Sequence, residues 1–143
     1  MTKPGRKVLV VPLRMGTDWE VLVLRRPAPK GGVWAPVTGH VEPGETDEVA
    51  AARELQEETG LASASALRAT GFVNRFEQER GGKRVAYEES VWAAVVRPGR
   101  QVRLSGEHVE SRWVTAAQAI EMVAFDGCKE AVRRAVAAVE PAA

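Results

Sequence analysis

Three glutamates crowded into one short stretch of the chain set the strongest constraint on its fold and chemistry. They are Glu54, Glu57 and Glu58, and their spacing would place Glu54 beside both of the others on one face of an α-helix. Like charges at these spacings destabilise a helix by roughly a few tenths of a kcal/mol per pair. A hard cation such as Mg²⁺ would offset that repulsion, because it binds carboxylate oxygens and keeps waters that a phosphate can replace. The cluster therefore predicts a divalent-cation site.

The residues around this cluster predict where the helix begins and ends. Thr46 is suited to the N-cap, acidic residues follow it at the positive end of the helix, and Gly60 is suited to the C-terminal stop. Val49, Ala52 and Leu55 recur at helical spacing. We therefore expect a helix that packs these three side chains against a core and presents the glutamates on its other side.

The glutamates belong to a longer pattern of spaced residues that extends beyond the expected helix, over 39–61 (GHVEPGETDEVAAARELQEETGL). Gly39 is followed by five residues and Glu45, and then by seven residues and the run RELQEETGL, which starts at Arg53. This pattern resembles the complete Nudix box, and the probability of a chance match over the chain is on the order of 10⁻⁵. An acidic helix face is usually only solvated. The fixed glycines and Arg53 argue against that simpler interpretation.

The resemblance implies a fold and an activity. Its fold is an α/β/α sandwich with a mixed β-sheet, in which the box forms a loop–helix–loop and its helix packs against the sheet. The implied reaction is hydrolysis of a nucleoside diphosphate linked to another group, by attack of water at phosphorus. The implied cofactor is Mg²⁺, with Mn²⁺ as a possibility, because such an ion neutralises phosphate charge and lowers the pKa of a bound water. The alternative is a Nudix-like domain that binds a ligand without turnover.

Roles within the box follow from the same resemblance. The metal ligands it implies are the carbonyl of Gly39 and the side chains of Glu54, Glu57 and Glu58. Glu45 and Arg53 are expected to form an ion pair that fixes the loop against the helix, and Gly60 supports the end of the box. Arg53 would orient the site rather than act as a base, because a guanidinium stays protonated. Glu57 and Arg53 thus belong to the expected catalytic machinery.

A further carboxylate is expected from outside the box, about fifty residues along the chain. The segment SGEHVESRW offers Glu107 and Glu110, and Glu107 is favoured because a glutamate–histidine pair precedes the final strand in similar pyrophosphatases. Its role would be metal ligand, base or both, whereas the simpler interpretation is a solvated loop glutamate. His40 and His108 are expected to be loop residues rather than catalysts, although their chemistry permits a base.

Substrate-binding residues are expected at the end of the second strand. Arg25 and Arg26, with Lys30 nearby, are suited to phosphate oxygens, or simply form a basic strand end. Trp34 could stack on a base or pterin ring, although large aromatic residues more often serve packing.

The flanks of the box favour one substrate class. The segment VWAPVTGHVEPGET and the ending WVTAAQAIEMVAF resemble dihydroneopterin triphosphate and dNTP pyrophosphatases. The proline typical of ADP-ribose hydrolases and the tyrosine typical of diadenosine polyphosphate hydrolases are both missing. We therefore expect a nucleoside or pterin triphosphate to be cleaved to a monophosphate and pyrophosphate. ADP-ribose and dinucleotide polyphosphates are the alternatives.

Composition limits the remaining possibilities. A chain of 143 residues with 45% hydrophobic and 27% charged residues is expected to form one domain over residues 1–143. The net charge of +1 gives no reason to expect nucleic-acid or anionic-membrane binding, and no apolar run is long enough to span a membrane. Cys128 is the single cysteine, so an internal disulfide is excluded and a cytoplasmic location is expected. The resemblance also makes a homodimer possible.

Periodicity and turn signals predict the other elements. A Pro/Gly-rich loop is expected over 25–36, and Gly81-Gly82 is expected to form a hairpin turn. The expected strands span 7–13, 20–25, 69–76, 84–97 and 109–114, and two further helices span 115–124 and 128–139.

Overall fold

The computed structural model describes residues 3–140, so both ends of the expected domain, residues 1 and 143, lie outside the described residues. Seven strands form the central sheet: β1 (Gly5–Met15), β2 (Trp19–Arg25), β3 (Trp34–Ala35), β4 (Val37–His40), β5 (Ser65–Arg80), β6 (Lys83–Val96) and β7 (Glu110–Thr115). The order is β3-β2-β1-β6-β5, while β4 also pairs with β1 and β7 pairs with β2. Because β1 is parallel to β6 and the other pairs are antiparallel, the sheet is mixed.

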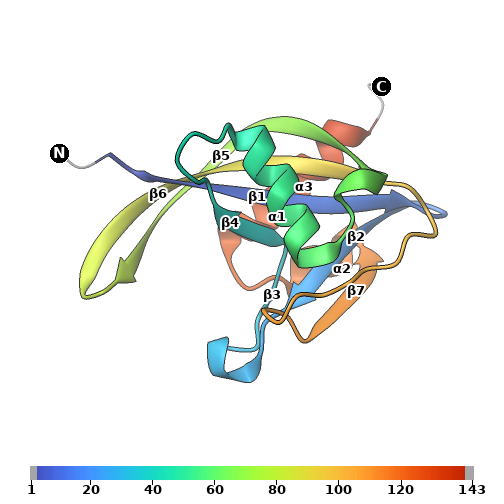
Figure 1. Ribbon diagram of the computed structural model, residues 1–143. Helices are drawn as coiled ribbons and strands as arrows, with labels where there is room; N and C mark the ends of the chain where they lie inside the picture. The colour runs from blue at the N-terminus through green and yellow to red at the C-terminus, as the bar shows by residue number, and fades with distance from the viewer. Residues whose placement is uncertain (1–2, 141–143) are drawn as a thin grey trace.

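Helices cover both faces of this sheet (Figure 1). The helix α1 (Asp47–Thr59) lies on one face, and α2 (Ala116–Met122) and α3 (Asp126–Val139) lie on the other. Two short 3₁₀ helices span Ala28–Lys30 and Ala62–Ala64. The predicted α/β/α sandwich with a mixed sheet is therefore confirmed. No helix within residues 3–140 has the length and apolar character needed to cross a membrane.

Successive side chains of β1 point to opposite faces of the sheet and so enter two separate apolar cores. Val8 and Val10 join the core under α1, whereas Leu9 and Val11 join the core under α2 and α3. All four side chains are fully buried. A continuous apolar run is what a strand needs when both of its faces are covered.

The helix α1 begins and ends where the sequence predicts. The Thr46 hydroxyl accepts a hydrogen bond from the Val49 amide at 3.2 Å, and Gly60 ends the helix with a φ of 72°. A positive φ costs glycine little, which explains the residue at that position.

The apolar face of α1 differs from the predicted one. Val49 is 54% exposed, whereas Ala51 and Leu55 are fully buried. The buried stripe continues one turn further to Glu58, which is only 3% exposed. The expectation that all the glutamates lie opposite the core is therefore wrong for Glu58, because the stripe is rotated by part of a turn from the predicted one.

Other elements largely follow the sequence. Gly81 and Gly82 form the two-residue turn of the β5–β6 hairpin, with φ values of 58° and 77°. This hairpin extends beyond the rest of the sheet in Figure 1. The short strand β3 lies in the segment that is expected to be a loop, 25–36, and β4 runs into the first two residues of the box. Strands of two and four residues are too short to show a period.

Candidate active site

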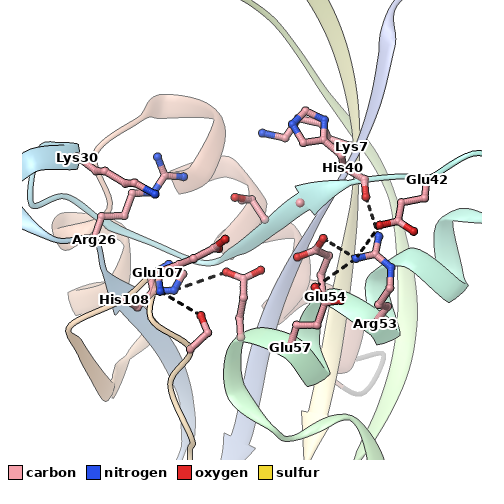
Figure 2. A pocket seen from close by; sticks show the side chains of 14 residues that line it. Lys7, Arg26, Lys30, His40, Glu42, Arg53, Glu54, Glu57, Glu107 and His108 are labelled. Atoms are coloured by element: carbon pink, nitrogen blue, oxygen red, sulfur yellow. Dashed lines mark hydrogen bonds and ion pairs between the residues drawn. The ribbon is translucent and has the colours of Figure 1, made fainter.

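A pocket of about 570 Å³ opens beside α1, where β4, the segment after β2 and the loop before β7 meet (Figure 2). Its charged lining consists of the carboxylates Glu42, Glu54, Glu57, Glu58 and Glu107 and the cations Lys7, Arg26, Lys30 and Arg53. In Figure 2, Arg26 and Lys30 face the carboxylates of α1 across the pocket. The side chain of Glu107 projects into the space between these basic residues and the carboxylates. A pocket with both charges is suited to a polyanion that binds together with a metal ion.

Arg53 links the two parts of the box. Its Nε donates to Glu45 Oε2 at 2.8 Å and its Nη2 donates to Glu45 Oε1 at 2.9 Å. The Nη1 atom donates to Glu54 Oε1 at 2.8 Å and to Glu57 Oε2 at 3.3 Å, while Nη2 also reaches the carbonyl of His40 at 2.9 Å. The Arg53 hydrogen bonds are the main cause that lowers the pKa of Glu45 to about 2, so Glu45 stays charged. The loop and the helix are therefore joined by a permanent ion pair.

Gly39 lies against the carboxyl group of Glu54. A methyl group at Gly39 would overlap that carboxyl group, so no other residue fits without moving Glu54. Gly39 is held in place by β4, where it pairs with Val8 of β1. The backbone of the box thus approaches the helix carboxylates closely.

Glu58 is the buried member of the cluster. Its Oε1 lies 3.7 Å from His108 Nδ1, and both Glu58 Oε2 and His108 Nδ1 are buried without a hydrogen-bond partner. Burial, followed by the neighbouring Glu54 and Glu107, raises the pKa of Glu58, and burial lowers the pKa of His108. A buried carboxyl oxygen without a donor is costly. Some ligand, proton or cation must therefore satisfy it.

The donor set fits a hard divalent cation. Within residues 3–140, no three His, Cys, Asp or Glu side chains form a preformed metal cluster, and Glu54 and Glu57 bond to Arg53 instead. The unpartnered oxygen of Glu58 and the close approach of Gly39 to Glu54 nevertheless offer oxygen atoms at one wall of the pocket. Oxygen donors are those that Mg²⁺ and Mn²⁺ prefer. The residues that could hold such an ion are Glu54, Glu57, Glu58, Glu107 and the carbonyl of Gly39.

Two of the expected substrate-binding residues do not line the pocket. Arg26 does so, but Arg25 points away, where its Nε donates to the Gly32 carbonyl at 3.2 Å and its Nη1 lies 3.7 Å from Glu110. Successive residues of an extended chain point to opposite sides, which separates the two arginines. Trp34 packs against the core under α3 instead of the pocket.

The sequence did not mark two charged residues of the pocket lining, and the weight given to a third residue was too low. Lys7 lies at the start of β1, opposite His40 of β4, and no local motif marks it. Glu42 also lines the pocket, 3.9 Å from Arg53. His108 was expected to be an ordinary loop residue, yet its side chain is buried against Glu58. The only signal in the sequence was its position beside Glu107.

Comparisons with known proteins identify the family and support the fold. A family model described as NUDIX domain matches residues 3–135. The structure of the E. coli dihydroneopterin triphosphate pyrophosphohydrolase is 27% identical and superimposes with a TM-score of 0.79, covering 95% of this chain and 99% of that chain.

The curated relatives that match in sequence include proteins with two different activities. The octanoyltransferase of Myxococcus xanthus is 37% identical over 135 residues, which make up 94% of this chain and 37% of that protein. The asymmetrical bis(5'-nucleosyl)-tetraphosphatase of Rattus norvegicus is 35% identical over 99 residues, or 67% of this chain and 65% of that protein. The chain thus spans about a third of the first relative and slightly less than two thirds of the second. Because the family model covers nearly the whole chain and the fold and box agree with it, this chain belongs to the NUDIX domain family.

Proposed function

We propose that this protein is a divalent-metal-dependent hydrolase of phosphoanhydrides, with Mg²⁺ as its ion and Mn²⁺ as a substitute. The observation that carries the proposal is the unpartnered, buried Oε2 of Glu58 in a pocket whose opposite wall carries Arg26 and Lys30. A cation at the carboxylates and basic side chains across from them would hold the two ends of a polyphosphate. When bound, the ion would neutralise phosphate charge and lower the pKa of the attacking water.

The residues of the chain divide the remaining work. Glu54, Glu57 and Glu58 would bind the ion, with the Gly39 carbonyl as a further donor. Arg26, Lys30 and Lys7 would bind phosphate oxygens. Glu107 stands on the loop that faces α1 and would complete the ligand set or accept the proton of the attacking water.

Arg53 and Glu45 would orient these groups without touching the phosphate. Arg53 bonds to Glu54 and Glu57, and Glu45 fixes Arg53 in turn. Such support around a metal site commonly affects metal affinity or activity by about 10–100-fold.

For the substrate, we propose a nucleoside or pterin triphosphate that is cleaved to the monophosphate and pyrophosphate. The fold similarity to a dihydroneopterin triphosphate pyrophosphohydrolase and the segments around the box support this choice. The similarity to bis(5'-nucleosyl)-tetraphosphatases supports a dinucleotide polyphosphate as the second candidate.

Acyl transfer by the matched region has no comparable support. The octanoyltransferase is much longer than the region it shares with this chain. Cys128, the single thiol, is buried, and burial raises its pKa to about 11, which disfavours the nucleophilic thiolate.

A substrate panel with metal tests the proposal directly. The wild-type protein is incubated with dNTPs, dihydroneopterin triphosphate, ADP-ribose and dinucleotide polyphosphates, each with Mg²⁺, with Mn²⁺ or with EDTA. We expect metal-dependent release of pyrophosphate from a triphosphate, detected together with the monophosphate product. Binding of a nucleotide without any turnover across the panel would contradict the enzyme and favour a ligand-binding domain.

A further inference from the structure

A second pocket, of about 400 Å³, adjoins the first one on the face of the sheet that α3 covers. The two pockets share Lys7, Arg26 and Thr38 in their linings. A ligand with its phosphates at the carboxylates of α1 can therefore extend into the second pocket. What occupies that pocket depends on its polar groups.

The polar centre of the second pocket is a row of three side chains on neighbouring strands. Lys7 of β1 lies opposite Glu89 of β6, and Glu89 lies opposite Asn74 of β5. Glu89 is 3% exposed and its Oε1 accepts a hydrogen bond from Asn74 Nδ2 at 3.2 Å. Within residues 3–140 the Asn74 amide is the side-chain donor bonded to Glu89, at Oε1, so Glu89 Oε2 is available to a ligand in the pocket that Glu89 lines.

The start of α3 fixes the orientation of this row. A methyl group at Gly127 would overlap the amide group of Asn74, so the glycine allows α3 to lie directly on that side chain. Cys128, the next residue, lines the pocket, and the charge of Glu89 is among the causes that raise the pKa of its thiol. The hydrogen bond between Asn74 and Glu89 and the contact of Asn74 with α3 thus fix the orientation of these two side chains.

Apolar surfaces complete the second pocket. Phe76 lines it and stacks on Tyr87 with ring centroids 5.5 Å apart. Phe125 also lines it and is 59% exposed. Flat rings suit such surfaces, because aromatic side chains stack readily on planar ligands.

These features select among planar rings by hydrogen bonding. A carboxylate only accepts hydrogen bonds, and its two oxygens match two parallel N–H donors. The guanine edge offers such a pair, the ring N1–H and the 2-amino group, and the 2-amino-4-oxo ring of a pterin offers the equivalent pair, N3–H and its 2-amino group. Adenine offers one acceptor beside one donor and leaves one carboxylate oxygen unmatched.

We infer that Glu89, positioned by Asn74, selects substrates whose ring carries a 2-amino group beside a ring N–H, as in guanine nucleotides and pterin triphosphates. This inference rests on the proposed function for the phosphate end of the site. The inference specifies which class of ring the site binds and which residue forms hydrogen bonds with that ring.

Removing one group from the substrate gives a test that needs no mutation. The base of dITP lacks only the 2-amino group of dGTP, so wild-type protein should show a kcat/KM about tenfold or more lower for dITP, mainly through KM. dATP should be a still poorer substrate. Dihydroneopterin triphosphate, assayed in parallel, distinguishes a guanine nucleotide from a pterin as the preferred source of the shared edge.

A substitution then assigns the preference to Glu89. In Glu89→Gln one oxygen becomes an N–H donor, so the side chain matches the adenine edge and no longer the guanine edge. The ratio of kcat/KM for dGTP to that for dATP should fall by about tenfold or more. Loss of folding cannot mimic a changed ratio. The exposed Glu79, on the same hairpin, is the matched control, and Glu79→Gln should keep the wild-type ratio.

Binding separates this inference from the proposed hydrolysis. Titration calorimetry with dGMP and dIMP in EDTA measures recognition of the ring without turnover. Equal affinity for the two, or equal kcat/KM for dGTP and dITP in an active enzyme, would overturn the role of Glu89 and leave the hydrolase intact. Selective dGMP binding without hydrolysis of any triphosphate would support Glu89 and overturn the proposed hydrolase.

Discussion

Arg53 donates two parallel hydrogen bonds of 2.8 and 2.9 Å to Glu45 and thereby connects the loop of the box to its helix. Only a planar guanidinium makes this paired contact, whereas a lysine ammonium makes a single one. Arg53→Lys should therefore keep the fold and lower metal affinity or kcat by about 10–100-fold. Manganese titration and steady-state kinetics measure this. Arg134→Lys, in the exposed pair with Glu130, is the control and should change neither quantity.

The close approach of Gly39 to Glu54 predicts a sharp effect of one added methyl group. Gly39→Ala would overlap the Glu54 carboxyl group and force it to move, so activity should fall by about tenfold or more. Gly16→Ala is a suitable control, since a methyl group there meets only ordinary contacts. The measurement is kcat/KM beside a circular dichroism melt. Unchanged kinetics in Gly39→Ala would remove Glu54 from the site.

From the buried position of Glu58 we predict how pH and metal together change the stability of the folded protein. Its pKa is raised in the folded protein, so the native state binds more protons than the unfolded state from about pH 4.5 upward. Metal-free stability should therefore fall as pH rises through this window, and a cation that replaces the proton should restore it. At a hundredfold excess over its Kd the ion adds about 2.7 kcal/mol.

Melting curves at pH 5, 6, 7 and 8, with Mg²⁺ and with EDTA, check this coupling. The gain in Tm from Mg²⁺ should grow with pH in the wild type and should nearly vanish in Glu58→Gln. Burial also raises the pKa of Glu89, but Glu89 is not one of the proposed metal ligands, so the difference between the curves with Mg²⁺ and with EDTA reports on Glu58. A gain in Tm that is the same at every pH would contradict the assignment.

The rotated stripe of α1 gives a test of packing. Leu55→Ala should lower the free energy of unfolding by about 2–5 kcal/mol, because Leu55 is fully buried. Val49→Ala on the same helix should change it by less than about 0.5 kcal/mol, because Val49 is 54% exposed. Urea unfolding followed by circular dichroism compares the two variants. Similar losses in both would favour the originally predicted face.

Local signals in the sequence predicted local structure well. Thr46 and Gly60 mark the ends of α1, and the glycine pair at 81–82 marks the β5–β6 turn. Each of these signals acts through a cap or a turn conformation within a few residues. The mixed sheet followed from the family resemblance and is confirmed, but the parallel pairing of β1 with β6 has no signal in either strand.

The site was less predictable where it depends on distant residues. Lys7 reaches the pocket, and Asn74 meets Glu89, only because three strands pair in one register. A motif within one segment cannot show that arrangement. Arg25 is expected at the substrate because it ends the second strand, and Trp34 because it lies next to the box, but strand alternation and core packing direct these two side chains elsewhere.

Metal-dependent hydrolysis at the glutamates of α1 is tested most directly at Glu57. Among the candidate ligands on α1, Glu57 is the exposed one, so Glu57→Gln should fold normally. The measurement is kcat for pyrophosphate release with saturating Mg²⁺, with Glu48→Gln on the same helix as control. We expect a loss of about 100-fold or more in Glu57→Gln and none in Glu48→Gln. Equal rates in Glu57→Gln and the wild type would contradict metal-dependent hydrolysis at these glutamates.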